Sequence, residues 1–155
     1  MSHLTTQFEP DLGRLSKMVL AGEDAAELAE ILRALVADLR PQTYLEMRQV
    51  ELIAQTDFEI DRNRRRIPAV ELHISEELYR RDFAGAARRA ELRGEDFVPP
   101  DLTAAAYLRG EETFLHLATQ IWRLERARVG HIEQFERMVR ARRARQAEDA
   151  EVLTE

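Results

Sequence analysis

The sequence contains no cysteine. This absence excludes disulfide bonds, thiolate metal ligands and cysteine nucleophiles. No apolar run approaches the roughly 18 to 20 residues that a transmembrane helix requires. The first ten residues also lack the basic and apolar segments of a signal peptide. From these absences we expect a soluble, cytoplasmic protein that does not associate with membranes.

Glycine, proline and aromatic residues are also scarce. Six glycines and five prolines among 155 residues provide few of the turns that a β-sheet protein needs. Aromatic residues make up 6% of the chain, whereas charged residues make up 34% and apolar residues 45%. This balance is typical of amphipathic helices around a common core. We therefore predict an all-α fold in one domain, with N-terminal helices followed by a long antiparallel, coiled-coil-like helical hairpin.

What the sequence does contain is a seven-residue repeat of apolar residues. Such a repeat is typical of helices that keep one seam against a neighbouring helix. Isoleucine recurs at this interval in the middle of the chain, and a second pattern follows nearer the C-terminus. We assign to the helix–helix interface Ile53, Ile60, Ile67, Ile74, Phe114, Ile121, Trp122 and Phe135.

Proline and glycine divide the helical regions. Pro41 follows one amphipathic stretch, Gly94 is suited to a helix C-cap, and Asp101 is suited to cap the helix that comes after the Pro-rich linker. The resulting segments are a mobile end over 1–11, N-terminal helices over 12–40, hairpin helices over 42–93 and 102–146, and a mobile acidic tail over 147–155.

Pro68 interrupts the first hairpin helix. A proline inside a helix removes a hydrogen bond and tends to kink the helix. The residues allow three outcomes: a kinked continuous helix, a second helix starting at Ser75, or a short strand over 70–74. We favour the continuous helix because the isoleucine repeat crosses Pro68 in phase.

Folding the hairpin back near residue 97 predicts a register. It places Gly85 near Gly110 and lays the acidic residues from Glu46 to Asp61 beside the arginines from Arg137 to Arg145. It also brings Arg64 near His131 and Glu71 near Arg128. Polar residues on such a seam select register and partner. We assign this role to Arg64, Glu71, Arg128 and His131.

The apolar face of the last helix is wider than a two-helix seam needs. Leu108, Leu115, Trp122 and Val129 form a further row beside the seam. The helix predicted over 23–40 covers part of this face, and a second copy of the chain is suited to cover the rest.

No pattern of catalytic or metal-binding residues is present. The Glu-x-x-His pairs of carboxylate metal sites are missing, as are the serine elbow and the glycine-rich phosphate and dinucleotide loops. We predict no catalytic residues, no metal site and no cofactor, and hence a protein that is not an enzyme.

Two arginine runs support an alternative. Each run could contact nucleic-acid phosphates, although the net charge of the chain is −6. The alternative is therefore a DNA- or RNA-associated accessory protein that uses Arg62, Arg64, Arg65, Arg66, Arg140, Arg142, Arg143 and Arg145.

A segment over residues 41–66, from Pro41-Gln42-Thr43 to Arg64-Arg65-Arg66, resembles short helical bacterial proteins of unknown function. The resemblance implies a helical fold and supplies no catalytic residues. Our main hypothesis is a non-enzymatic protein–protein interaction or scaffolding module that acts through helix–helix packing. Its partner is a second copy of itself or another helical protein.

Overall fold

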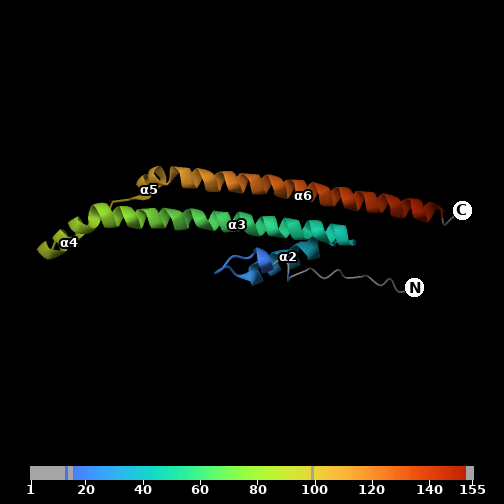
Figure 1. Ribbon diagram of the computed structural model, residues 1–155, viewed down its shortest axis with the longest axis horizontal. Helices are drawn as coiled ribbons and strands as arrows, with labels where there is room; N and C mark the ends of the chain where they lie inside the picture. The colour runs from blue at the N-terminus through green and yellow to red at the C-terminus, as the bar shows by residue number, and fades with distance from the viewer. Residues whose placement is uncertain (1–12, 14–15, 99, 153–155) are drawn as a thin grey trace. The chain divides into compact units, whose positions relative to one another are not determined.

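The computed structural model describes residue 13, residues 16–98 and residues 100–152 (Figure 1). Every regular element within these residues is helical, which confirms the predicted all-α fold. In chain order the elements are the 3-10 turn η1 (Ser16–Met18), helices α2 (Ala25–Leu39) and α3 (Tyr44–Leu78), the π-helical turn η2 (Tyr79–Phe83), and helices α4 (Ala84–Arg93), α5 (Thr103–Arg109) and α6 (Glu111–Val152). The predicted mobile end over 1–11 lies outside the described residues.

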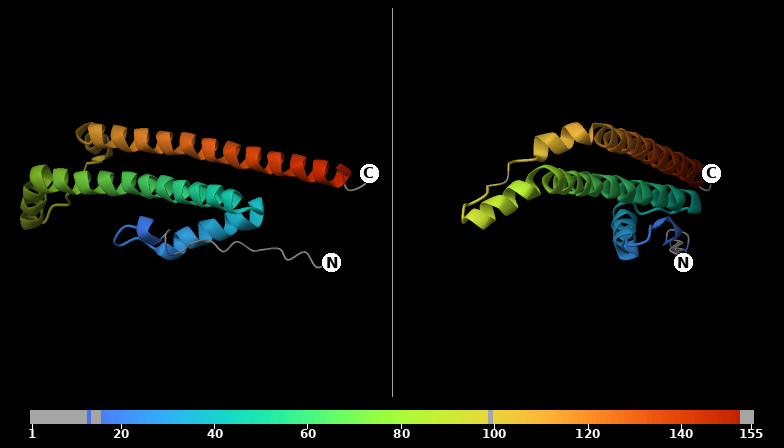
Figure 2. Two further views of the ribbon diagram at one scale, coloured as in Figure 1. Left: turned by 45° about the vertical axis from the view of Figure 1, so that its right-hand side comes forward. Right: turned by 60° about the vertical axis from the view of Figure 1, so that its left-hand side comes forward.

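The described chain forms two compact units, and the prediction of a single domain stays a prediction. Unit 1 comprises the described residues up to Ile60 and those from Arg123 onward, and unit 2 comprises Asp61–Trp122. Helices α3 and α6 each contribute residues to both units. Within each unit α3 and α6 lie side by side and antiparallel (Figures 1 and 2), which confirms the predicted helical hairpin.

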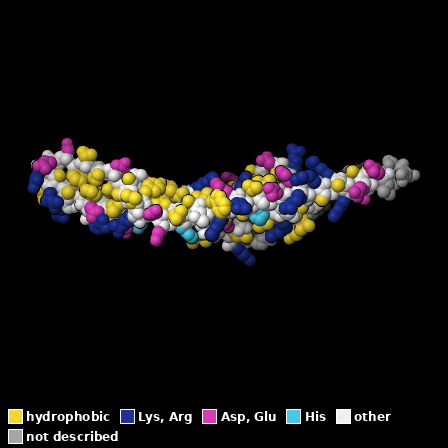
Figure 3. Space-filling model, turned by 90° about the horizontal axis from the view of Figure 1, so that it is seen from above, with side chains coloured by type: hydrophobic (Ala, Val, Ile, Leu, Met, Phe, Trp, Pro, Cys, Tyr) yellow, Lys and Arg dark blue, Asp and Glu magenta, His cyan; other side chains and the backbone are white. Residues whose placement is uncertain are grey.

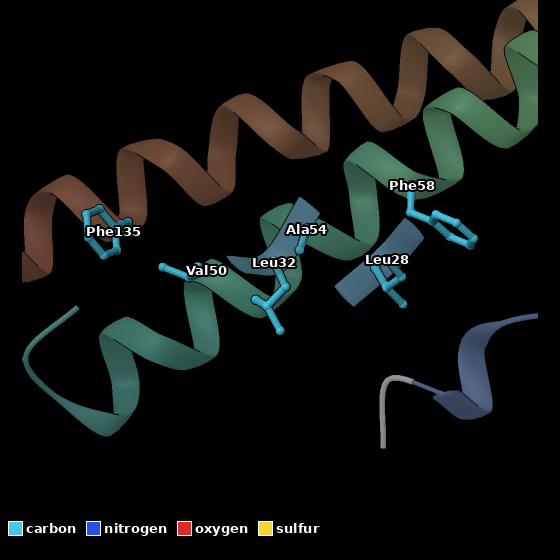
Figure 4. Packing of buried hydrophobic residues seen from close by; sticks show 6 residues of the cluster. All are labelled: Leu28, Leu32, Val50, Ala54, Phe58 and Phe135. Atoms are coloured by element: carbon cyan, nitrogen blue, oxygen red, sulfur yellow. The ribbon is translucent and has the colours of Figure 1, made fainter. Parts of the chain in front are cut away.

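Unit 1 has a core made by three helices. Leu28 and Leu32 of α2 meet one side of α3, and Phe135 of α6 points toward α3 from the other side (Figure 4). The α3 members of this cluster are Val50, Ala54 and Phe58, which are almost completely buried. Helix α2 lies within the predicted helix over 23–40. It packs mainly against α3, on the side away from α6 (Figure 4), so the expectation that it covers the wide apolar face of the last helix is wrong.

Local sequence explains both ends of α2. Asp24 is the N-cap, and its carboxylate accepts a hydrogen bond from the Ala26 backbone N–H at 2.8 Å. At the other end Arg40 adopts a left-handed conformation with φ of 47°. The following residue, Pro41, disfavours the right-handed α region at Arg40. The helix therefore ends at Leu39, as the proline predicts.

Helix α3 passes through Pro68 without interruption, so the predicted continuous helix is confirmed and the alternative strand over 70–74 is wrong. The helical path continues beyond Leu78 as the π-helical turn η2 and then as α4. Phe83, at the start of α4, leaves the usual helical range with φ of −123°. The sequence carried no signal for this π-helical turn.

The linker and the second hairpin helix differ in part from the prediction. Gly94 caps α4 with φ of 68°, a left-handed conformation that favours glycine, as expected. Asp101 also acts as expected and accepts a hydrogen bond from the Thr103 backbone N–H at 2.9 Å. This bond, together with that from the Thr103 hydroxyl, holds the pKa of the Asp101 carboxyl below its usual value.

The single helix predicted over 102–146 is wrong at both its middle and its end. Gly110 separates α5 from α6, although the hydrogen bonds on both sides of it keep helical spacing. Helix α6 continues to Val152, so the predicted mobile tail is helical over residues 147–152. Alanine and glutamate dominate this stretch, and both are strong helix formers.

The predicted register of the hairpin is correct in setting Glu46 beside the second arginine run, since Glu46 pairs with Arg142, but its other pairings are wrong. Arg128 pairs with Asp57 where Glu71 was expected, and Gly110 faces Ile74 where Gly85 was expected. The prediction treated the linker as a tight hinge, but the described residues 95–98 and 100–102 lie outside any helix. Non-helical chain covers up to about 3.3 Å per residue against 1.5 Å in a helix. Each residue of the returning helices α5 and α6 therefore lies beside a lower-numbered residue of α3 than a tight hinge would allow.

The close approach at Gly110 leads to a test by substitution. A Cβ atom at Gly110 would lie 2.6 Å from Ile74 Cδ1 and 2.7 Å from the Phe114 ring, whereas a Cβ at Gly130 would meet nothing within 4 Å. We expect Gly110→Ala to lower the free energy of unfolding by about 1–2 kcal/mol because the packed side chains must move apart. The matched change Gly130→Ala should raise it by about 0.5–1 kcal/mol through helix propensity. Urea unfolding followed by circular dichroism measures both, and an unchanged Gly110→Ala variant would contradict the close approach.

Candidate interaction surface

The residues assigned to the helix interface differ in how far they are buried. Ile53, Ile60 and Phe135 are buried, all in unit 1. Four others are half-buried: Ile67, Ile74, Phe114 and Ile121. Trp122 is 56% exposed and therefore contributes to the surface rather than to a seam within the chain.

The residues assigned to set the register are brought together only in part. Arg128 forms a hydrogen-bonded ion pair with Asp57 across α3 and α6. Arg64 is largely exposed and lies 3.8 Å from Asp61, so its predicted place in the seam beside His131 is wrong. Glu71 lines a surface groove in unit 2, and His131 is half-buried. The observed partner of Arg128 is therefore Asp57, which lies about four helical turns before the predicted Glu71 in α3.

A second cross-helix ion pair joins the start of α3 to α6. Glu46 is only 1% exposed, and its carboxylate accepts hydrogen bonds from Arg142 Nε at 2.8 Å and from the Gln42 backbone N–H at 2.6 Å. The Thr43 hydroxyl in turn accepts a hydrogen bond from the Glu46 backbone N–H. Thr43 and Glu46 are three residues apart, which is the spacing of a helix capping box. That spacing was the available sequence signal for this site.

The arginines of the nucleic-acid alternative already have acidic neighbours at several positions. Arg142 pairs with Glu46, Arg140 lies 3.5 Å from Glu136, and Arg64 lies near Asp61. Arg65, Arg66, Arg143 and Arg145 are exposed, and Arg62 is half-buried. The two runs belong to different units. These contacts lower the positive charge that each run presents to a phosphate backbone.

Unit 2 carries more large apolar side chains on its surface than in its interior. Among its described residues only three apolar side chains are buried: Leu78, Ala106 and Leu117. Seven large ones are exposed: Leu72, Leu92, Val98, Tyr107, Leu108, Leu115 and Trp122. Figure 3 shows hydrophobic side chains gathered over the elements of this unit. Exposed apolar patches of this kind mark surfaces that bind other molecules.

Three of these residues form a row on α5 and α6, and we call it the α5–α6 face: Leu108, Leu115 and Trp122. They lie seven residues apart and are 79%, 66% and 56% exposed. Beside them is a shallow groove lined by Tyr107, Leu108, Glu111, Phe114, Leu115 and Ala118. The rings of Tyr107 and Phe114 stack with their centroids 4.4 Å apart, so two of the side chains that line the groove pack against each other.

A second groove of unit 2 lies along the end of α3. Its lining includes Leu72, Tyr79 and Pro100, together with the acidic residues Glu71, Glu76 and Asp101. The Tyr79 ring meets the Phe97 ring edge-on at 6.5 Å. This groove is more acidic than the α5–α6 face and lacks its regular spacing.

The described residues contain no group of three or more histidine, aspartate or glutamate side chains placed to hold a metal ion. In the same part of the chain, none of the helices combines the length and the apolar character needed to cross a lipid bilayer.

The buried pair between Glu46 and Arg142 gives the second prediction. We expect Arg142→Ala to lower the free energy of unfolding by about 2–4 kcal/mol, because it leaves a buried carboxylate without its cationic partner. Arg140→Ala, two residues away, removes an exposed pair and should lower it by less than about 0.5 kcal/mol. Chemical denaturation of both variants makes the comparison, and equal losses would show that Glu46 does not depend on Arg142.

Comparisons with protein-family models, with curated proteins and with solved structures found no match for this chain. The resemblance of residues 41–66 to short helical bacterial proteins therefore stays a prediction.

Proposed function

We propose that this protein is a non-enzymatic interaction or scaffolding module that binds a helical partner on unit 2. The partner is a second copy of the chain or another helical protein. The observation that carries the proposal is the excess of exposed over buried large apolar side chains in the described part of unit 2. Covering such side chains stabilises a complex by roughly 25 cal/mol for each Å² of apolar surface removed from water.

The geometry of the α5–α6 face supports a helix as the ligand. Its three exposed residues repeat every seven positions, which is the spacing that packs into the holes of a neighbouring helix. The lining of the groove beside them is mostly apolar, with Glu111 at its border. An amphipathic helix that lies in a groove of this kind uses apolar anchors at helical spacing.

Photo-cross-linking in the native host tests the proposal. We expect a benzoylphenylalanine at Leu115 to cross-link to a peptide from a helical region, which mass spectrometry then identifies. The matched control carries the same residue at Leu45, which is 62% exposed but lies in unit 1. If Leu115 yields no cross-linked protein beyond those obtained from Leu45, the proposal is wrong.

The nucleic-acid alternative makes a separate prediction. Because Arg142 and Arg140 have carboxylate neighbours within the chain, we expect no retardation of duplex DNA or single-stranded RNA in a low-salt gel-shift assay. A salt-sensitive shift that Arg143→Glu and Arg145→Glu abolish would favour the accessory-protein function instead. These two side chains are exposed, so the substitutions should not disturb the core.

A further inference from the structure

The α5–α6 face carries an ordered set of charges as well as apolar residues. Glu111 and Glu112 stand at the start of α6, before Leu115 and Trp122. Arg123 and, one turn later, Arg126 follow Trp122 on the same continuous helix. All four of these charged side chains are exposed. Glu125, between the two arginines, is half-buried, so from Glu111 to Arg126 the exposed charges of the helix change from acidic to basic.

This charge order distinguishes between the ways in which two copies of α6 can pack together. In a parallel pair the two glutamate-bearing turns would face each other, as would the two arginine-bearing turns. In an antiparallel pair the glutamates of each copy face the arginines of the other. Opposite charges at such positions stabilise helix pairs modestly, and like charges destabilise them by a similar amount.

The apolar residues match under the same two-fold symmetry. An antiparallel arrangement centred between Ala118 and Thr119 sets Leu115 against Trp122 of the other copy. It also brings Glu112 within about 3 Å, measured along the helix axis, of the level of Arg123 of the other copy. Ala118 is small, and the Thr119 hydroxyl is already bonded to the Leu115 carbonyl at 2.8 Å. The centre of the pair can thus be approached closely without burying a polar group that lacks a partner.

We propose that a second copy of this chain is the partner, packed antiparallel through α6 with the α5–α6 face of each copy covered by the other. The inference rests on the proposed function and names its occupant. The covered strip is one helix wide, which places the interface at the small end of the size range for specific complexes. We therefore expect a reversible dimer in the micromolar range rather than a permanent one.

Charge reversal tests the arrangement with the full-length chain. In Glu112→Arg each homodimer has arginine against arginine at two places, and in Arg123→Glu it has glutamate against glutamate. We expect each variant alone to dimerise about tenfold more weakly than the natural chain. An equimolar mixture of the two variants restores both attractive contacts and should dimerise like the natural chain. Sedimentation velocity over a concentration series measures all three.

Trp122 provides an independent readout, because it is the one tryptophan in the chain. Its emission should shift to shorter wavelength as the dimer forms, and the shift should return when the two variants are mixed. Glu91→Arg and Arg88→Glu on α4 are matched controls, since both side chains are exposed and lie off α6. The controls should dimerise like the natural chain, and the helical content of every variant should be unchanged.

Two outcomes overturn the inference. A natural chain that stays monomeric up to several hundred micromolar excludes the second copy as partner. The antiparallel pairing through α6 is excluded if the dimerisation affinity is unchanged in both charge-reversal variants. It is also excluded if mixing the two variants fails to restore the affinity of the natural chain. Neither outcome changes the result expected from cross-linking at Leu115. A failure of the dimer inference can therefore be distinguished from a failure of the proposed function.

Discussion

The structure of unit 1 depends on a constraint on α3, which has apolar residues on two of its faces and must be covered on both. Leu28 and Leu32 of α2 cover one face, and Phe135 of α6 covers the other. Two ion pairs add specificity to the second contact: Glu46 with Arg142 and Asp57 with Arg128. Breaking a buried pair is far more destabilising than its net contribution suggests. Only the Glu46 pair is buried, whereas Asp57 and Arg128 are partly exposed. We therefore expect the Glu46 pair to oppose a change of register more strongly than the Asp57 pair.

In unit 2 fewer apolar side chains are covered by neighbouring helices than in unit 1. The described residues of unit 2 comprise the rest of α3, the turn η2, the short helices α4 and α5, and the start of α6. The consequence is a small interior and a surface rich in leucine and aromatic side chains. The contrast between the two units is the physical basis for proposing that unit 2 acts by binding. A third helix, supplied by another chain, would give it the same three-helix cover.

Much of the fold was predictable because its causes are local. The seven-residue repeat around Ile53 and Ile60, the cap at Gly94 and the Asp101 hydrogen bond each depend on residues within a turn or two of one another. The errors lie elsewhere. Most pairings predicted between α3 and α6 were wrong because the register depends on the path of the linker between Gly94 and Thr103, and the role of Arg64 was wrong for the same reason. The π-helical turn Tyr79–Phe83 had no signal in the residue pattern.

The sequence by itself determined the all-α class, the approximate helices and the row of Leu108, Leu115 and Trp122. Helical periodicity and capping depend only on residues that are close together in the chain. The sequence could not determine which apolar rows remain uncovered or which carboxylate meets which arginine. Those outcomes depend on contacts between residues far apart in the chain, such as Glu46 with Arg142. Only the tertiary structure decided them, since a buried row and an exposed row have the same periodicity and differ only in whether another helix lies against them.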